Sequence, residues 1–105
     1  MSGISTHVLD TARGRPAAGI RVHLSRGGVV IGSRLTGEDG RISSLLPAGT
    51  PLQPGRYLLV FETGSYYPEA FFPEVSILFE VRDAESHHHV PLLISPFGYT
   101  TYRGS

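Results

Sequence analysis

Apolar and polar residues alternate along much of this chain. Ile20, Val22 and Leu24 share one face of a segment whose other face carries Arg, His and Ser side chains. Segments 57–62 and 75–82 repeat the arrangement, and the second shows it most clearly. A period of two is typical of β-strands that bury one face. The pattern therefore predicts a strand in each of the three segments.

Shorter or less regular alternation predicts further strands. They cover residues 4–9, 29–35, 41–46, 90–95 and 99–103. The 13 glycines and 8 prolines separate these segments with turns, as at residues 27–28 and 38–40. Residues 64–70 are the one place where a short helical turn fits. So many short strands predict an all-β sandwich or small barrel, and residues 1–105 show no internal domain boundary.

Composition narrows the possible functions. The chain has 105 residues and no cysteine, which excludes disulfides, thiol catalysis and cysteine-bound metals. Nine basic and nine acidic residues cancel, so no basic patch is expected and nucleic acid is not an expected partner. Charged residues make up 17% of the chain, against about 25% in typical proteins, which indicates that copies of the chain cover part of its surface.

The sequence predicts neither a secretory signal nor a membrane-spanning segment. The first residues lack the basic start and apolar run of a secretory signal. No apolar run approaches the ~20 residues that span a bilayer. We therefore expect a cytoplasmic protein with no membrane partner.

Histidines are the first candidates for chemistry, because imidazole exchanges protons near neutral pH. His7 shares a strand face with Ser5, and on an extended chain His87 and His89 point to the side opposite His88. A metal ion held by His7, His87 and His89 is one alternative, although no acidic residue lies at a convincing ligand spacing. The other is a solvated triplet, with a backbone carbonyl capping His7.

Two further features are candidates for binding. Arg41 follows the turn at residues 38–40, where it is expected either to be solvent-exposed or paired with a local carboxylate, or to clamp a planar anion. The C-terminal segment 95–105 contains two tyrosines, a phenylalanine and an arginine, whereas chain ends are usually polar and frayed. This segment is therefore expected to dock as an edge strand or to line a site with its last residues.

The two ends of the chain carry motifs of a known family. The segment ISTHVLD at residues 4–10 and the segment HVPLLISPFGYTTYRGS at residues 89–105 resemble the signatures of the transthyretin-related 5-hydroxyisourate hydrolases. The terminal Tyr-Arg-Gly-Ser separates those hydrolases from the hormone-carrying transthyretins. The resemblance runs along the whole chain and includes the Asp-Gly-Arg at residues 39–41.

The resemblance implies a fold and an assembly. The fold is a transthyretin- or prealbumin-like β-sandwich of two four-stranded sheets with one short helix. The assembly is a homotetramer, a dimer of dimers, whose active sites lie between dimers. No metal and no organic cofactor takes part in the family's reaction.

The resemblance also implies a reaction and its residues. The reaction hydrolyses 5-hydroxyisourate to 2-oxo-4-hydroxy-4-carboxy-5-ureidoimidazoline in urate catabolism. The catalytic set falls on His7, Arg41, His89 and Ser105, and the substrate-binding set on Tyr102, Arg103 and Gly104.

The family's roles follow from the chemistry of amide hydrolysis. Either His7 or His89 is expected to take a proton from the attacking water. Arg41 would hold the developing oxyanion. The hydroxyl or terminal carboxylate of Ser105 would hold the water or tune a histidine, while Tyr102 and Arg103 anchor the tail. The alternatives are a transthyretin-like carrier of small aromatic ligands, which needs an apolar channel, and a purely structural domain.

Overall fold

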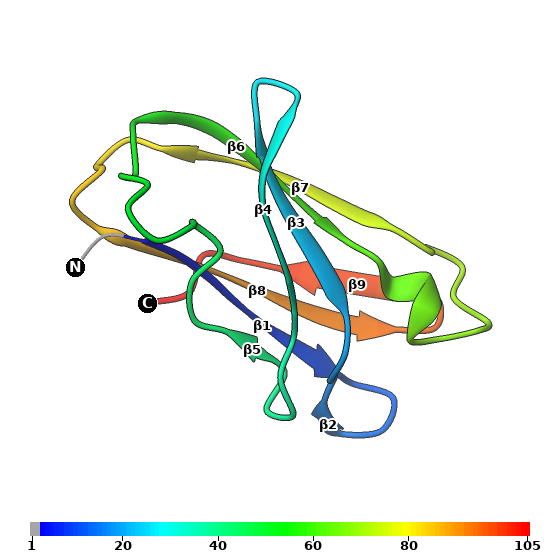
Figure 1. The fold of residues 1–105 in the computed structure, drawn as a ribbon. Helices are drawn as coiled ribbons and strands as arrows, with labels where there is room; N and C mark the ends of the chain where they lie inside the picture. Colours follow the sequence, from blue (N-terminus) through cyan, green and yellow to red (C-terminus); the bar gives the residue numbers. More distant parts are fainter. Residues whose placement is uncertain (1–2) are drawn as a thin grey trace.

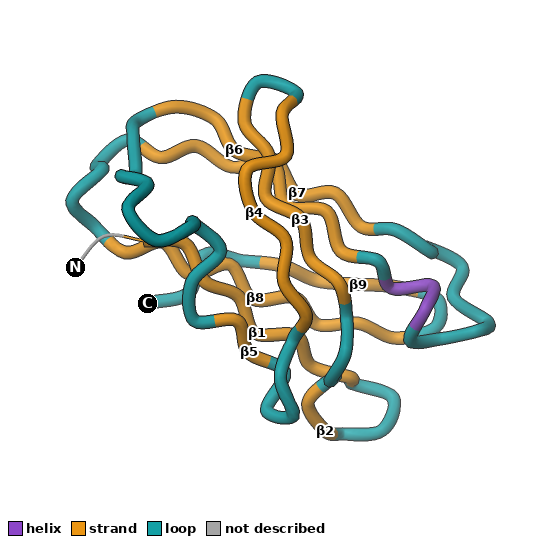
Figure 2. The backbone as a smooth tube through the Cα atoms, viewed as in Figure 1, coloured by secondary structure: helices purple, strands orange, loops and turns teal. Residues whose placement is uncertain are grey.

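The computed structural model describes residues 3–105, which form two β-sheets packed face to face (Figures 1 and 2). The first sheet contains β2 (Arg15–Pro16), β1 (Gly3–Asp10), β8 (His87–Ser95) and β9 (Gly98–Thr101), with β5 (Arg41–Ile42) also paired to β1. The second contains β4 (Val29–Leu35), β3 (Arg21–Arg26), β6 (Gly55–Phe61) and β7 (Val75–Val81). The predicted all-β sandwich is confirmed, and its first sheet gains a fifth strand from the short β5.

Three predicted strands differ at their ends from the observed ones. The strand predicted at residues 41–46 is limited to Arg41–Ile42, because the chain then turns inward and buries Leu45. The strand predicted at 90–95 begins earlier, at His87, where pairing with β1 already starts. The strand predicted at 99–103 ends at Thr101. The histidine triplet is therefore part of a strand and not a solvated segment before one.

Helical structure is minimal. The helical turn predicted within residues 64–70 is the 3-10 turn η1 (Thr63–Ser65), which starts one residue earlier. No helix within residues 3–105 is long and apolar enough to cross a membrane.

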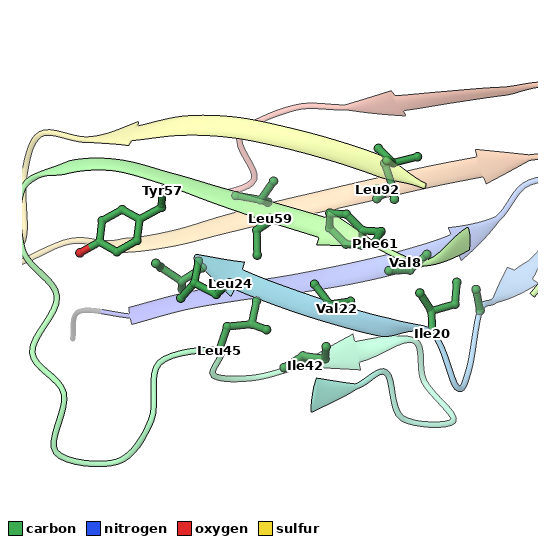
Figure 3. Close-up of a cluster of buried hydrophobic side chains, with 14 of the residues drawn as sticks. Val8, Ile20, Val22, Leu24, Ile42, Leu45, Tyr57, Leu59, Phe61 and Leu92 are labelled. Atoms are coloured by element: carbon green, nitrogen blue, oxygen red, sulfur yellow. The ribbon is translucent and has the colours of Figure 1, made fainter. Parts of the chain in front are cut away.

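The core lies between the two sheets (Figure 3). Val22 and Leu24 of β3 and Leu59 of β6 point inward from one sheet, and Val8 of β1 and Leu92 of β8 point inward from the other. Side chains alternate between the two faces of a strand, so the residues between these apolar positions point to the outer faces. On β1 and β8 those outward residues carry the candidate chemistry.

A buried carboxylate anchors the end of β1. Asp10 accepts hydrogen bonds from the hydroxyls of Tyr66, at 2.7 Å, and Tyr67, and from the backbone N–H groups of Ala12 and Arg13, each at 3.1 Å. Burial raises the pKa of this carboxyl, but the hydrogen bonds from Tyr67 and Tyr66 outweigh it and lower the pKa from 3.8 to about 2. Asp10 thus ties β1 to the turn before β2 and to the segment after η1.

We expect Asp10→Asn to lower the free energy of unfolding by about 2–3 kcal/mol, because the amide cannot accept all of these bonds. The carboxylate has a lower pKa in the folded state, so its contribution is complete above the unfolded pKa of 3.8 and is lost as the pH falls towards about 2. The difference between the variant and the wild type should therefore shrink by about 2 kcal/mol between pH 5 and pH 2 in urea titrations. Glu69→Gln, at an exposed position, is the control. If the difference in unfolding free energy between Asp10→Asn and the wild type does not change with pH, the negative charge of Asp10 is not what stabilises the fold.

Candidate active site

The topology of the first sheet gathers the candidate residues on one face. β1 lies between β5 and β8 (Figure 1), pairing antiparallel with the first and parallel with the second. In this register His7 is opposite Arg41, and Ser5 is opposite His89. Paired residues of neighbouring strands project to the same side of a sheet. The two ends of the chain and the turn before β5 therefore contribute to one cluster.

A pocket of about 330 Å³ opens over this cluster. It is lined by Ser5, Thr6, Arg41, Ile42, Ser43, His87, His89 and Ser105. His7 lies at its edge, next to Arg41 in the sheet. The pocket is large enough for a small heterocycle, and most of its lining residues are polar.

His89 is prepared to accept a proton. Its Nδ1 lies 2.7 Å from the Ser5 hydroxyl oxygen. Partial burial lowers the pKa of this imidazole, and the positive charge of Arg41 lowers it further, as do His7 and His87 when they are protonated. A lowered pKa keeps His89 neutral at neutral pH, which is the state a general base needs.

The turn before β5 holds His7 in a defined orientation. Its Nε2 donates a hydrogen bond of 2.9 Å to the backbone carbonyl of Asp39, so the predicted carbonyl cap on His7 is confirmed. Gly40 makes the turn possible, because its φ is +77° and a Cβ there would lie 2.4 Å from the Val8 carbonyl oxygen. With Nε2 donating, the Nδ1 of neutral His7 carries the lone pair. The turn thus sets the tautomer of His7 and places Arg41 beside it.

Arg41 is exposed, and within residues 3–105 no carboxylate lies within ion-pair distance of its guanidinium. Only its backbone N–H contacts Asp39, donating to the side-chain carboxylate at 2.9 Å. The expectation that Arg41 is either solvent-exposed or paired with a local carboxylate is therefore met by exposure, without the ion pair, and the guanidinium is left for an anionic or polar group in the pocket.

The C-terminal tail docks against His89. The backbone N–H of Gly104 donates to the His89 carbonyl at 2.8 Å, and Ser105 reaches the pocket. A Cβ at residue 104 would lie 2.5 Å from His89 Cδ2, so only glycine lets the tail approach the imidazole this closely. Tyr102 and Arg103 instead line a second pocket, of about 140 Å³, that both His88 and His89 border. Of the four predicted tail residues, Ser105 lines the pocket over the histidine cluster, Gly104 packs against His89, and the other two lie at the second pocket.

Five pocket residues were not among the predicted catalytic and substrate-binding residues: Ser5, Thr6, Ile42, Ser43 and His87, the last of which was considered only as a metal ligand. Ser5 lies two positions before His7, and His87 lies two positions before His89, so each shares a strand face with a predicted residue. This two-residue spacing was the feature of the sequence that could have identified Ser5 and His87 as pocket residues. Among residues 3–105, no group of three or more His, Cys, Asp or Glu side chains is arranged to hold a metal ion.

The other two histidines lie elsewhere. His88 is buried on the opposite face of β8, where its Nδ1 donates to the Ser86 carbonyl at 3.1 Å. His23, on the second sheet, pairs with Glu62.

Comparison with known proteins places the chain in a family. The model described as HIUase/Transthyretin family matches residues 4–104. The chain belongs to this HIUase/Transthyretin family. It is 44% identical to a Pseudomonas aeruginosa protein named 5-hydroxyisourate hydrolase, over 100% of this chain and 93% of the relative. It is also 44% identical to the Arabidopsis thaliana protein named Uric acid degradation bifunctional protein TTL, but spans 37% of that longer protein.

Solved structures of the HIUase/Transthyretin family share the fold. The structure of Klebsiella pneumoniae 5-hydroxyisourate hydrolase superposes with a TM-score of 0.90, at 40% identity and full coverage of both chains. Transthyretin from Sparus aurata superposes with a TM-score of 0.85, at 26% identity over 96% of this chain and 95% of that one. The predicted transthyretin-like fold is therefore confirmed.

The packing of the C-terminal tail against His89 predicts the effect of adding one methyl group at residue 104. Gly104→Ala should push the His89 ring away from the tail and lengthen its hydrogen bond to Ser5, because the new Cβ would overlap Cδ2. A crystal structure of the variant measures this displacement directly. Gly14→Ser is a control, because a Cβ at Gly14 meets no atom within 4 Å, although its φ of +67° carries a small local cost. An unmoved His89 ring in Gly104→Ala would contradict the proposed close packing.

Proposed function

We propose that this member of the HIUase/Transthyretin family hydrolyses 5-hydroxyisourate to 2-oxo-4-hydroxy-4-carboxy-5-ureidoimidazoline in urate degradation. One observation carries the proposal. A neutral imidazole, His89, and a guanidinium without a carboxylate partner, Arg41, share one pocket. The similarity to proteins named 5-hydroxyisourate hydrolase, at 40–44% identity, supports the choice of substrate.

The reaction opens a ring by adding water to an amide carbonyl. His89 takes a proton from the water as its oxygen attacks the carbonyl carbon. The carbon–nitrogen bond then breaks, the nitrogen takes up a proton, and the carbonyl becomes a carboxylate. His7, oriented by the Asp39 carbonyl, holds the substrate through the Nδ1 lone pair when it is neutral, and supplies the proton to the leaving nitrogen when Nδ1 is protonated.

The other residues stabilise charge and position the reactants. Arg41 faces the developing oxyanion, where a fixed cation lowers the energy of the transition state. Ser105 lies at the pocket, where its hydroxyl or its terminal carboxylate can hold the attacking water or tune a histidine. Gly104 brings the tail against His89, and Tyr102 and Arg103 anchor the tail from the adjacent pocket. This division of labour requires no metal or organic cofactor.

A carrier of small aromatic ligands is the alternative within the same family. Such a carrier needs a mainly apolar site. The pocket of this chain presents His87, His89, Arg41 and three serines among its lining residues. These side chains suit a planar polar heterocycle and favour the hydrolase.

We also propose a homotetramer, a dimer of dimers, with the pocket at the interface between dimers. Two observations support it. The pocket lies on the outer face of a sheet, where a second copy could close it, and large apolar side chains such as Phe71, Leu78 and Phe97 are exposed. The proposal extends to one hydrolase domain over residues 1–105, in the cytoplasm.

The activity can be tested in a coupled ultraviolet time course. Urate oxidase generates 5-hydroxyisourate from urate, and the decay of its absorbance is followed with and without this protein. We expect clear acceleration over the spontaneous decay. His89→Asn and His7→Asn should each lower turnover by about 10²–10⁴, the usual contribution of a general base or acid.

His23→Asn is the matched control, because His23 lies on the other sheet. Decay at the spontaneous rate with the folded wild-type protein would refute the hydrolase. Wild-type turnover in one histidine variant would remove that residue from the mechanism.

The assembly can be tested by dilution. If the interface completes the site, specific activity should fall in parallel with the tetramer fraction measured by analytical ultracentrifugation. Circular dichroism at the same concentrations checks that the dissociated chain stays folded. A folded monomer with full specific activity would show that the pocket of one chain is sufficient.

A further inference from the structure

A single hydroxyl joins two histidines beside the pocket. The Ser5 Oγ lies 2.7 Å from His87 Nε2 and 2.7 Å from His89 Nδ1. Ser5 is 7% exposed, so its hydroxyl has little access to water as a substitute partner. The parallel register of β1 and β8 creates the arrangement, because it places Ser5 beside His89 and Gly3 beside His87. Gly3 has no side chain to fill the space next to the His87 ring.

Two arrangements satisfy both contacts and also use the hydroxyl hydrogen. The oxygen has two lone pairs and could accept from both imidazoles, but the hydroxyl hydrogen would then have no acceptor, because within residues 3–105 the Ser5 Oγ is hydrogen-bonded only to these two nitrogens. One imidazole must therefore donate to Ser5 while the other accepts from it. The choice decides which nitrogen of His89 carries the hydrogen.

The packing of the His89 ring, together with the lone pair that a base needs, decides which nitrogen of His89 carries the hydrogen. Its Nδ1 faces Ser5, and its Cδ2 packs against Gly104 on the other edge. The edge that remains, containing Nε2, is the one available to a molecule in the pocket. A base acts through a lone pair, so an active His89 must carry its hydrogen on Nδ1 and donate it to Ser5. The Ser5 hydroxyl then donates to His87 Nε2.

We propose that Ser5 and His87 are positioning residues that hold neutral His89 in the Nδ1-protonated tautomer. His87 acts as the acceptor that orients the Ser5 hydroxyl away from His89. The oriented oxygen accepts the Nδ1–H of His89 and leaves the lone pair on Nε2. When His89 takes a proton from water, the same bond becomes charge-assisted and stabilises the imidazolium. The catalytic part of this inference rests on the proposed hydrolase function.

Variants of the two residues have different expected effects. In His87→Ala the Ser5 hydroxyl loses its acceptor and is free to donate to His89 Nδ1, which moves the hydrogen of His89 to Nε2. In Ser5→Ala both hydrogen bonds of the hydroxyl are lost, so nothing at residue 5 favours either tautomer of His89. Ser5→Thr keeps the hydroxyl and should keep the wild-type tautomer. His87 is exposed, so its truncation should leave the fold intact.

The experiment is nitrogen NMR of the full-length protein labelled with ¹⁵N-histidine, without substrate and at a pH where His89 is neutral. The signals of His89 are assigned by their loss in His89→Asn. We expect the wild type and Ser5→Thr to carry the hydrogen on Nδ1, and His87→Ala to carry it on Nε2. His23→Ala, on the other sheet, should leave the His89 signals unchanged.

The kinetic counterpart uses the same variants. We expect kcat to fall about tenfold or more in His87→Ala and Ser5→Ala, within the about 10²–10⁴ that the base itself contributes, with little change in KM. A wild-type His89 protonated on Nε2 would overturn the inference, as would His87→Ala with the wild-type tautomer and kcat. The NMR measurement needs no substrate, so it tests the tautomer even if the hydrolase proposal fails. Activity from an Nε2-protonated His89 would overturn this inference and leave the hydrolase standing.

Discussion

Parallel pairing between β1 and β8 is the contact on which both the sandwich and its pocket depend. It joins residues from the two ends of the chain along the full length of β1, from Gly3 to Asp10. The inward residues of the pair, such as Val8 and Leu92, complete the core. The outward residues, Ser5 and His89, form the floor of the pocket. One register therefore sets both the packing of the core and the geometry of the candidate chemistry.

Two glycines let backbone segments approach this floor more closely than any other residue allows. Gly40 passes over β1 near the Val8 carbonyl, and so brings Arg41 beside His7. Gly104 passes over the His89 ring and brings Ser105 to the pocket. These two close approaches add Arg41 and Ser105 to the side chains that β1 and β8 already provide at the pocket.

The protonation state of His89 follows from its burial and from the basic groups that surround it in the pocket. Partial burial and neighbouring positive charge both disfavour a charged His89. Asp10, at the other end of β1, shows the opposite case, because hydrogen bonds from tyrosines favour its charged form despite burial. The β1–β8 pair therefore keeps an imidazole neutral at one end, on β8, and a carboxylate ionised at the other, on β1. The first suits proton transfer, and the second anchors the fold.

The sequence alone determined the class of fold, most strand positions and the main candidate residues, His7, Arg41 and His89. It could predict the strands because a period of two specifies which side chains share a face, and the resemblance of the chain ends to a known family supplied the set of site residues. Alternation does not specify which strands pair or in what register. Only the tertiary structure placed Ser5 between two imidazoles and turned Tyr102 and Arg103 towards a second pocket. The contacts of Ser5 join residues more than eighty positions apart, which no local pattern encodes.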